Sequence, residues 1–336
     1  MQRKEYSLVV GGKTVTATFS DMVAQANGSV IMKVGETSIL ATAVMSSNIK
    51  EGLDYLPLTV DYEERLYAAG KIPGGFIRRE GRPSAEAILA GRLVDRTIRP
   101  LLPKTWRRDI QVIVTVLSTD QENDPNLLGI IGASAALCLT EVPFEGPVSG
   151  VTVGYLGGQY VLNPLLPQLT TSALDLVICS TRKNLVMVEA GAKEVSEDII
   201  AGALKFGHEA NQAVNELQEE FLQGLQISKT EAPGEWNNPE AMAAVAEVLN
   251  GRLSSCLGLM ERQLRQSRQE SLLKELNEKL KDRFNPEDIT NAFETQLKAL
   301  IRSNVLEKSQ RFDGRGLTDI RPISCEVGLM PRTHGS

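Results

Sequence analysis

The fold is decided near the start of the chain, by residues 6–19, which read YSLVVGGKTVTATF. Tyr6–Val10 is mostly apolar, Gly11 and Gly12 follow, and Val15–Phe19 alternates between apolar and polar side chains. Two such runs joined by a pair of glycines are typical of a β-hairpin. The chain is therefore expected to open with an antiparallel sheet.

The segments that follow continue the sheet and add helices. Gly28–Val34 and Thr37–Met45 read as a second hairpin, and the segment from Pro83 to the residue before Pro100 reads as a helix with Pro83 in its first turn. Apolar and periodic runs then predict strands at Ile110–Leu117, Val148–Leu156, Gln159–Leu162, Leu174–Cys179 and Leu185–Glu189, and helices at Leu127–Thr140 and Ser196–Gln223. This order predicts an α+β domain over residues 1–225.

The composition changes after this domain. Residues 226–239 are rich in Pro, Gly and Asn and are interpreted as a linker, and residues 240–307 predict only helices, two or three in number. One helix is expected to begin at Asn285, which can cap it. Leucines at heptad-like spacing are interpreted as a core seam rather than a coiled coil: Leu264, Leu272, Leu276 and Leu280.

Composition excludes several classes of protein. The 336 residues carry a net charge of -6, and they contain no apolar run of the roughly 18 residues that a membrane span needs. The N-terminus lacks the apolar segment of a signal peptide, so a cytoplasmic protein is expected. The four cysteines form no Cys-x-x-Cys pair, and the two histidines, His208 and His334, lie far apart. Disulfides, a histidine metal site and a Ser-His-Asp triad are therefore not predicted.

The charge is unevenly distributed. Residues 71–108 hold ten Lys and Arg against three acids, although the chain as a whole is acidic. Within this stretch, residues 70–83 read GKIPGGFIRREGRP and combine glycines, an aromatic ring and consecutive guanidinium groups. Such a loop suits single-stranded RNA, because guanidinium groups bind phosphates and rings stack on bases. The predicted RNA-binding residues are Phe76, Arg78, Arg79, Arg82, Arg92 and Arg96.

An alternative for this loop remains open. It could be a surface loop whose arginines pair with Glu63, Glu64 or Glu80. A second cluster, Asp120, Glu122 and Asp124, lacks the glycine and the closing glutamate of a calcium loop and is interpreted as a solvated acidic loop. No Walker or dinucleotide-binding fingerprint is present, and no metal site is predicted within the chain.

Several longer motifs resemble bacterial polynucleotide phosphorylases. They are LPLTVDYEER at 56–65, YAAGKIPGGFIRREG at 67–81, RLVDR at 92–96, VEAGA at 188–192, RFDGR at 311–315 and IRPI at 320–323. The resemblance implies an RNase PH-like domain of the ribosomal protein S5 domain 2-like fold, an all-α domain, and at 308–336 the opening strand of a truncated second RNase PH-like domain. A weak internal repeat between residues 326–336 and 19–29 agrees with a second copy.

The resemblance also implies a function. Members of this family form homotrimeric rings that thread single-stranded RNA, and they degrade mRNA from its 3′ end by processive phosphorolysis, using inorganic phosphate and Mg²⁺ and releasing nucleoside diphosphates. They also work with partners in RNA-degradation complexes. This chain is expected to supply RNA threading and ring assembly. The family's Phe-Phe-Arg-Arg loop falls on residues 76–79, where Ile77 replaces the second ring.

The family's catalytic residues lie in the second copy, so catalysis is not expected in this chain. In the first copy the metal-binding segment corresponds to residues 172–177, where Ala173 stands for an acid and Val177 for a lysine, and the serine-rich phosphate loop corresponds to residues 120–125. Asp175 alone is a poor Mg²⁺ site, so the Mg²⁺ ligands are expected beyond Ser336. Two alternatives are a non-catalytic module that binds single-stranded RNA and a different nucleotide reaction near Asp120.

Overall fold

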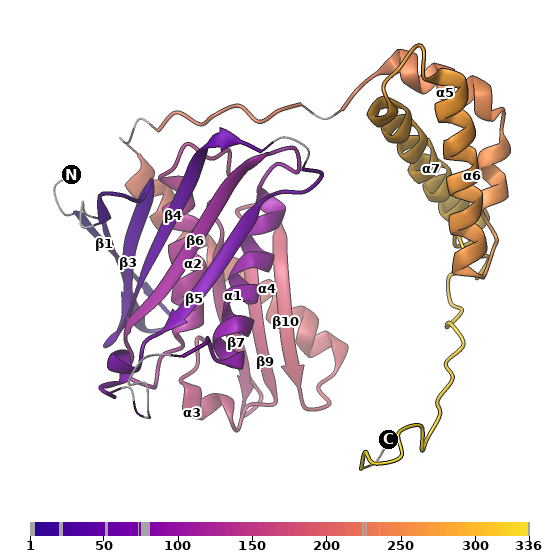
Figure 1. Ribbon diagram of the computed structural model, residues 1–336. Helices are drawn as coiled ribbons and strands as arrows, with labels where there is room; N and C mark the ends of the chain where they lie inside the picture. The colour runs from indigo at the N-terminus through magenta and orange to yellow at the C-terminus, as the bar shows by residue number, and fades with distance from the viewer. Residues whose placement is uncertain are drawn as a thin grey trace. The chain divides into compact units, whose positions relative to one another are not determined.

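The computed structural model describes residues 4–19, 23–50, 53–72, 74, 81–223, 225, 227–234 and 236–334. The chain divides into two compact units, Met1–Gly234 and Glu235–Ser336. The first unit holds two β-sheets and the second is helical (Figure 1). The predicted α+β domain followed by a helical region is therefore confirmed.

The first sheet has six strands, in the order β1-β2-β3-β4-β6-β5. The predicted opening hairpin is present, with Val10 paired to Lys13 across the glycine turn. All neighbours are antiparallel except β5 and β6, which run parallel and are connected through a helix. The strands are β1 (Lys4–Val10), β2 (Lys13–Phe19), β3 (Gly28–Val34), β4 (Thr37–Ile49), β5 (Leu58–Glu64) and β6 (Arg108–Ser118).

The second sheet has four antiparallel strands, in the order β10-β9-β7-β8. The strands are β7 (Ser149–Leu156), β8 (Gln159–Leu162), β9 (Leu174–Ser180) and β10 (Leu185–Ala192). Each lies within a few residues of its predicted range. The short elements of this unit are η2 (Leu66–Ala69), η3 (Arg99–Leu101) and α3 (Leu166–Leu169).

Three longer helices pack on these sheets. Helix α1 (Ala85–Ile98) lies beside β5, and α4 (Glu197–Leu222) packs on β7 and β9. Helix α2 (Pro125–Cys138) contacts β3 and β4 of the first sheet and β7 of the second, so it lies in the core between them (Figure 1). Pro83 was expected in the first turn of α1, but the helix starts later because Ser84 is the N-cap and accepts a hydrogen bond of 3.0 Å from the Ala87 N–H.

Two close approaches define the core. An added Cβ on Gly28 of β3 would lie 2.1 Å from the carbonyl oxygen of Ala136, so only glycine lets α2 approach the sheet this closely. At the end of β2, the rings of Phe19 and Phe221 have centroids 4.1 Å apart, which ties this strand to the end of α4. A close backbone approach therefore fixes α2 against β3, and a ring contact fixes the end of α4 against β2.

The second unit contains α5 (Pro239–Leu249), η4 (Arg252–Cys256), α6 (Arg262–Leu280) and α7 (Pro286–Lys308). Asn285 caps α7 as predicted, accepting a hydrogen bond of 2.7 Å from the Asp288 N–H. Leu264 was predicted to join the leucine seam, but it is 53% exposed, since the buried face of α6 begins only at Leu272.

The segment after α7 differs from its prediction. The expected opening strand is not formed in the described residues 308–334, which contain one isolated bridge, between Gln310 and Gly316.

The cysteines are free thiols, three of them buried and Cys325 exposed. None of the helices in the described part of the chain combines the length and apolar character needed to cross a bilayer.

Candidate functional site

Two segments that the sequence analysis paired lie together in the structure. The acidic loop between β6 and α2 shares a cavity with Thr152 of β7, and β7 pairs with the start of β9, where Gly154 lies opposite Asp175. The backbone N–H of Leu166 donates a hydrogen bond of 2.9 Å to the Glu122 carbonyl oxygen, which fixes the α3 segment against the same loop. The loop and its neighbours therefore form one site.

Asp120 is occupied by hydrogen bonds from the protein. Its carboxylate accepts five, at 2.7–3.1 Å, from the Glu36 N–H, the Thr37 hydroxyl, the Glu122 N–H, and the Asn123 backbone and side-chain N–H groups. Burial acts to raise the pKa of Asp120, but the hydrogen bonds from Asn123, Glu122 and Thr37 outweigh it, and the pKa is well below its usual range. Asp120 therefore holds the loop in shape as an ionised group.

Asp124 has the opposite character. It caps α2 by accepting a hydrogen bond of 2.9 Å from the Asn126 N–H. Burial raises the pKa of Asp124 to about 6; the hydrogen bond from Asn126 acts against this shift, and the charge of Asp175 adds to it. Asp175 itself has a raised pKa, from burial and from the charge of Glu189. The charge of Asp175 therefore disfavours ionisation of Asp124, and the charge of Glu189 disfavours ionisation of Asp175.

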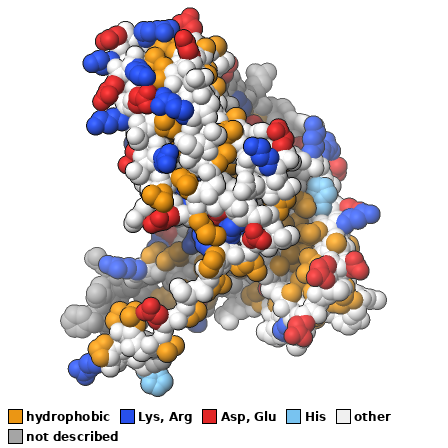
Figure 2. All heavy atoms as spheres, turned by 90° about the vertical axis from the view of Figure 1, so that its right-hand side faces the viewer, with side chains coloured by type: hydrophobic (Ala, Val, Ile, Leu, Met, Phe, Trp, Pro, Cys, Tyr) orange, Lys and Arg blue, Asp and Glu red, His pale blue; other side chains and the backbone are white. Residues whose placement is uncertain are grey.

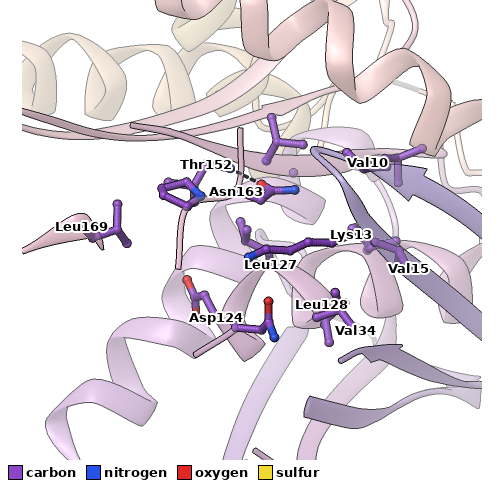
Figure 3. Close-up of a pocket in the computed structure, with 16 residues that line it drawn as sticks. Val10, Lys13, Val15, Val34, Asp124, Leu127, Leu128, Thr152, Asn163 and Leu169 are labelled. Carbon is purple, nitrogen blue, oxygen red and sulfur yellow. Dashed lines mark hydrogen bonds between the residues drawn. The ribbon is translucent and has the colours of Figure 1, made fainter. Parts of the chain in front are cut away.

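A small cavity of about 40 Å³ adjoins this loop (Figure 3). Lys13 of β2 reaches it, and Asp124 lines it from the start of α2. Burial lowers the pKa of Lys13, while Asp120 and Glu122 act to raise it. The side-chain oxygen of Asn123 is buried and has no hydrogen-bond partner among the described residues. Lys13 was missed by the sequence analysis because it lies more than 100 residues from the loop that it approaches.

The residues at this site do not fit Mg²⁺. Both oxygens of Asp120 already accept hydrogen bonds from the protein, so this carboxylate is not free to bind a metal. Over the ranges that the structure describes, no three His, Cys, Asp or Glu side chains are grouped so that they could hold a metal. Clustered carboxyls also repel phosphate. At this loop the described side chains therefore do not form a Mg²⁺ site.

The predicted RNA-binding residues are only partly described. Phe76, Arg78 and Arg79 lie outside the described residues. Arg82 and Arg92 are exposed, and neither forms an ion pair with any residue that the structure describes. Arg96 is also exposed, but it donates a hydrogen bond of 2.6 Å to Glu189 and one of 3.4 Å to the Val188 carbonyl.

Other members of the basic stretch have structural roles. Arg99 binds both carboxylate oxygens of Asp95, at 2.6 and 2.8 Å, and donates to the carbonyls of Leu56 and Leu58 at 3.4 and 3.2 Å. Arg107 donates to the carbonyls of Lys104 and Trp106. Arg99 and Arg107 therefore have partners within the protein, and spacing along the chain did not reveal the carbonyl groups of Leu56 and Leu58 that Arg99 contacts.

The acidic partners proposed for the loop arginines have other contacts. Glu63 pairs with Arg65 and accepts a hydrogen bond of 3.3 Å from Thr115, and Glu64 accepts one of 2.8 Å from Ser84. Glu80 lies outside the described residues. The alternative in which the loop arginines pair with Glu63, Glu64 or Glu80 therefore stays open.

Comparisons with known proteins agree with this architecture. Residues 11–143 match domain 1 of the 3′ exoribonuclease family, residues 146–210 match domain 2 of that family, and residues 240–316 match the RNA-binding domain of polyribonucleotide nucleotidyltransferase. Among solved structures, rice (Oryza sativa) Rrp46 has a TM-score of 0.51 at 14% identity, covering 66% of this chain and 96% of that one. This similarity is one of fold.

Curated relatives give the closer similarity. The chain is 46% identical over 331 residues to the polyribonucleotide nucleotidyltransferase of Dehalococcoides mccartyi, and 44% identical over 333 residues to that of Heliobacterium modesticaldum. Each alignment covers 98% of this chain but only 46% and 47% of the relatives, so the chain spans slightly less than half of their length. On the three consecutive family matches and these identities, the chain belongs to the polyribonucleotide nucleotidyltransferase family.

Proposed function

We propose that this chain is the RNA-guiding and ring-forming part of a phosphorolytic 3′-to-5′ exoribonuclease. In the proposed reaction of the whole protein, inorganic phosphate attacks the phosphorus of the terminal phosphodiester of mRNA, and the bond to the 3′ oxygen of the preceding nucleotide breaks. The terminal nucleotide is released as a nucleoside diphosphate, and the shortened strand keeps a 3′ hydroxyl. Mg²⁺, which residues outside this chain would hold, would supply positive charge to stabilise the charge that develops. The family membership supports this reaction. The proposed enzyme is processive, so it removes many nucleotides from one strand before it dissociates.

The proposal that this chain's own site is catalytically silent rests on one observation. The carboxylate of Asp120 accepts five hydrogen bonds from neighbouring protein groups, so it is not available to join Asp175 in binding a metal. The proximity of Asp124 and Asp175 adds negative charge where phosphate and RNA would have to bind. The geometry therefore supports a structural role for the loop at 118–126.

RNA contact is proposed at the arginine loop and along the adjoining helix α1. Arg82 and Arg92 support this assignment because they are exposed cations without an acidic partner among the described residues. Phe76, Arg78 and Arg79 are included on sequence grounds, as a ring and two guanidinium groups next to a pair of glycines. Arg96 is included because its guanidinium pairs with Glu189 but is still about half exposed, so it can also contact an RNA phosphate. Assembly as a homotrimer, a cytoplasmic location and partners in RNA-degradation complexes belong to the same proposal.

The catalytic part of the proposal is tested with the chain as it stands. The chain is incubated with oligo(A), phosphate and Mg²⁺, and ADP release is measured by chromatography. RNA binding without ADP release is the expected result. ADP release that persists after repurification and disappears in an Asp175→Ala variant would contradict the silent site.

The RNA contact is tested by substitution. Arg78→Ala combined with Arg79→Ala should weaken binding to all single-stranded sequences alike and reduce the salt dependence by up to about two phosphate contacts. Lys33→Ala combined with Lys205→Ala removes the same charge from exposed positions on β3 and α4 and serves as the control. Equal effects of the two pairs would remove the special role assigned to the loop.

A further inference from the structure

The connection between β5 and α1 carries the arginine loop, and a hydrogen bond joins the two ends of this connection. The Ser84 hydroxyl donates this bond to Glu64 Oε2, over a distance of 2.8 Å. Glu64 is the last residue of β5, and Ser84 directly precedes the first residue of α1. Two residues that are 20 positions apart in the sequence are therefore held together at the base of the loop.

Ser84 has a second role in the same place. Its side-chain oxygen accepts a hydrogen bond of 3.0 Å from the Ala87 N–H and so caps α1. A hydroxyl group has one proton to donate and lone pairs with which to accept, so both bonds form at once. The Ser84 side chain is therefore fixed from two sides, by the helix that follows it and by the strand that precedes the loop.

The strand and the helix are themselves packed together (Figure 1). An added Cβ on Gly91 of α1 would lie 3.5 Å from Cβ of Tyr62 and 3.6 Å from the carbonyl oxygen of Val60, both on β5. Glu64 is paired with Val116 of the neighbouring strand β6. The hydrogen bond between Glu64 and Ser84 therefore joins two elements that already have fixed positions, and its own effect is on the chain at the base of the loop.

The other arm of the connection is also anchored. The Thr119 N–H donates a hydrogen bond of 3.0 Å to the carbonyl oxygen of Ala68 in η2, and the Lys71 N–H donates one of 3.0 Å to the carbonyl oxygen of Leu66. The connection is thus held up to Lys71 on one side and again from Ser84 on the other.

Stability alone does not account for a carboxylate at the end of β5. Glu64 and Ser84 are both exposed, and a hydrogen bond that is open to water contributes little to the free energy of folding. The negative charge of Glu64 also opposes the binding of RNA nearby. The hydrogen bond to Ser84 is therefore the feature that gives Glu64 a role beside the proposed RNA contact.

The placement of single cations matters for this contact. Figure 2 shows acidic and basic side chains intermingled over the face turned to the viewer, so net charge does not mark a path for RNA on that face. Arg82 lies two residues before Ser84, Arg92 lies on α1, and both are exposed. Guanidinium groups whose positions are set in advance lose less conformational entropy when they bind one strand together.

We propose that Glu64 and Ser84 are positioning residues for the RNA contact, because their hydrogen bond fixes the course of the chain from Arg82 into α1. Arg82 and Arg92 are then carried on one frame and act on the same strand. This inference rests on the proposed RNA contact at the arginine loop and adds two residues that act through Arg82 without touching RNA.

The test compares Glu64→Ala with Glu64→Gln in the whole 336-residue chain. Both variants remove the same charge, but only glutamine keeps a side-chain oxygen that can accept from Ser84. Glu64→Ala should bind labelled oligo(A) about three- to fivefold more weakly than Glu64→Gln at low salt. Their thermal midpoints should agree within about 2 °C, since the bond is exposed. Equal affinities of the two variants would overturn the proposal.

Two controls accompany this comparison. Glu86 lies in the first turn of α1, and Glu86→Ala and Glu86→Gln should give equal affinities, because the same charge is removed without opening the base of the loop. Ser84→Thr keeps a hydroxyl that can both cap α1 and donate to Glu64, so it should retain the affinity of the unsubstituted chain. A difference at Glu86 as large as that at Glu64 would also contradict the proposal.

A double-mutant cycle with Arg82→Gln separates this inference from the proposed function. Arg82→Gln alone should weaken binding and reduce the salt slope by about one phosphate contact. In that background the affinity difference between Glu64→Ala and Glu64→Gln should fall to less than about half. If Arg82→Gln has no effect, the RNA contact at Arg82 fails and the inference fails with it. If Arg82→Gln weakens binding but the difference between the Glu64 variants persists in full, the contact stands and the positioning role is overturned.

Discussion

Arg96 Nη1 donates a hydrogen bond of 2.6 Å to Glu189 Oε2, and this ion pair joins helix α1 to the edge strand β10. The two residues belong to motifs far apart in the sequence, RLVDR and VEAGA, and the fold brings them into contact. Both side chains are about half exposed, so the pair contributes little to stability, about 1 kcal/mol or less. Its larger effect is on the charge that Arg96 presents to a ligand.

Glu189→Gln should therefore increase RNA affinity. Removing the carboxylate releases the Arg96 guanidinium for phosphate, and an increase of about two- to threefold at low salt is expected, diminishing as salt is raised. Glu216→Gln is the matched control, because Glu216 pairs with the exposed Arg182 on another surface. If both variants raise affinity equally, net charge rather than Arg96 is responsible.

Asp124→Asn should stabilise the protein at neutral pH. The pKa of Asp124 is raised to about 6 from an ordinary value of 3.8, so the folded chain binds the proton more tightly, and stability falls as pH rises from about 4 to 6. Asparagine does not ionise, so the variant does not lose folding stability over this pH range. It also keeps the helix cap, because asparagine caps helices well. Urea unfolding at pH 7.5 should show a gain on the order of 1–3 kcal/mol that disappears near pH 4. A constant difference across this range would be inconsistent with the raised pKa.

Asp120→Asn should have the opposite pH signature. The pKa of Asp120 is depressed, so its ionised form stabilises the folded chain above the ordinary value of 3.8, and that stability is lost as pH falls through the folded-state pKa. At pH 7 the variant should be less stable by about 1–3 kcal/mol, because an amide cannot accept the same set of hydrogen bonds. Unfolding curves of the two proteins should converge as the pH is lowered below about 4.

Gly28→Ala should disrupt the packing of α2 against β3. The new methyl group would lie 2.1 Å from the Ala136 carbonyl oxygen, so strand and helix must separate, and a loss of about 2 kcal/mol or more is expected. Gly191→Ala on β10 is the control, since no atom lies within 4 Å of its added Cβ and its φ is not positive. Similar thermal midpoints for the two variants would argue against a tight α2 contact.

Much of the fold follows from local sequence patterns. The glycine turn at Gly11 and Gly12 and the Asn285 cap depend only on neighbouring residues, and both are seen as predicted. The start of α1 was placed too early because proline is acceptable at several positions near a helix start, and only the Ser84 side chain decides the register. Leu264 fits the periodicity of α6 but lies beyond the part of that helix that other helices cover.

The site is less accessible to sequence reasoning. The pairing of the loop at 120–125 with the segment at 172–177 came from resemblance to a family, and the structure places them near each other. The hydrogen-bond and ion-pair partners of individual side chains could not be predicted from the sequence or from the resemblance. Strand order and register bring Lys13 close to Asp120 and Glu189 into contact with Arg96. Composition and residue spacing give no information about strand order or register. Long-range pairing is therefore the information that the sequence alone lacked.

The contact between the rings of Phe19 and Phe221 also has a consequence for synthesis on the ribosome. The two residues are separated by about 200 positions, so at the usual 5–20 residues per second the second ring emerges roughly 10–40 s after the first. During that interval the nascent hairpin exposes an aromatic face that only a late helix can cover. Chaperones that bind early in translation would find their target there, and a pause before residue 221 would lengthen the period in which the chain is prone to aggregate.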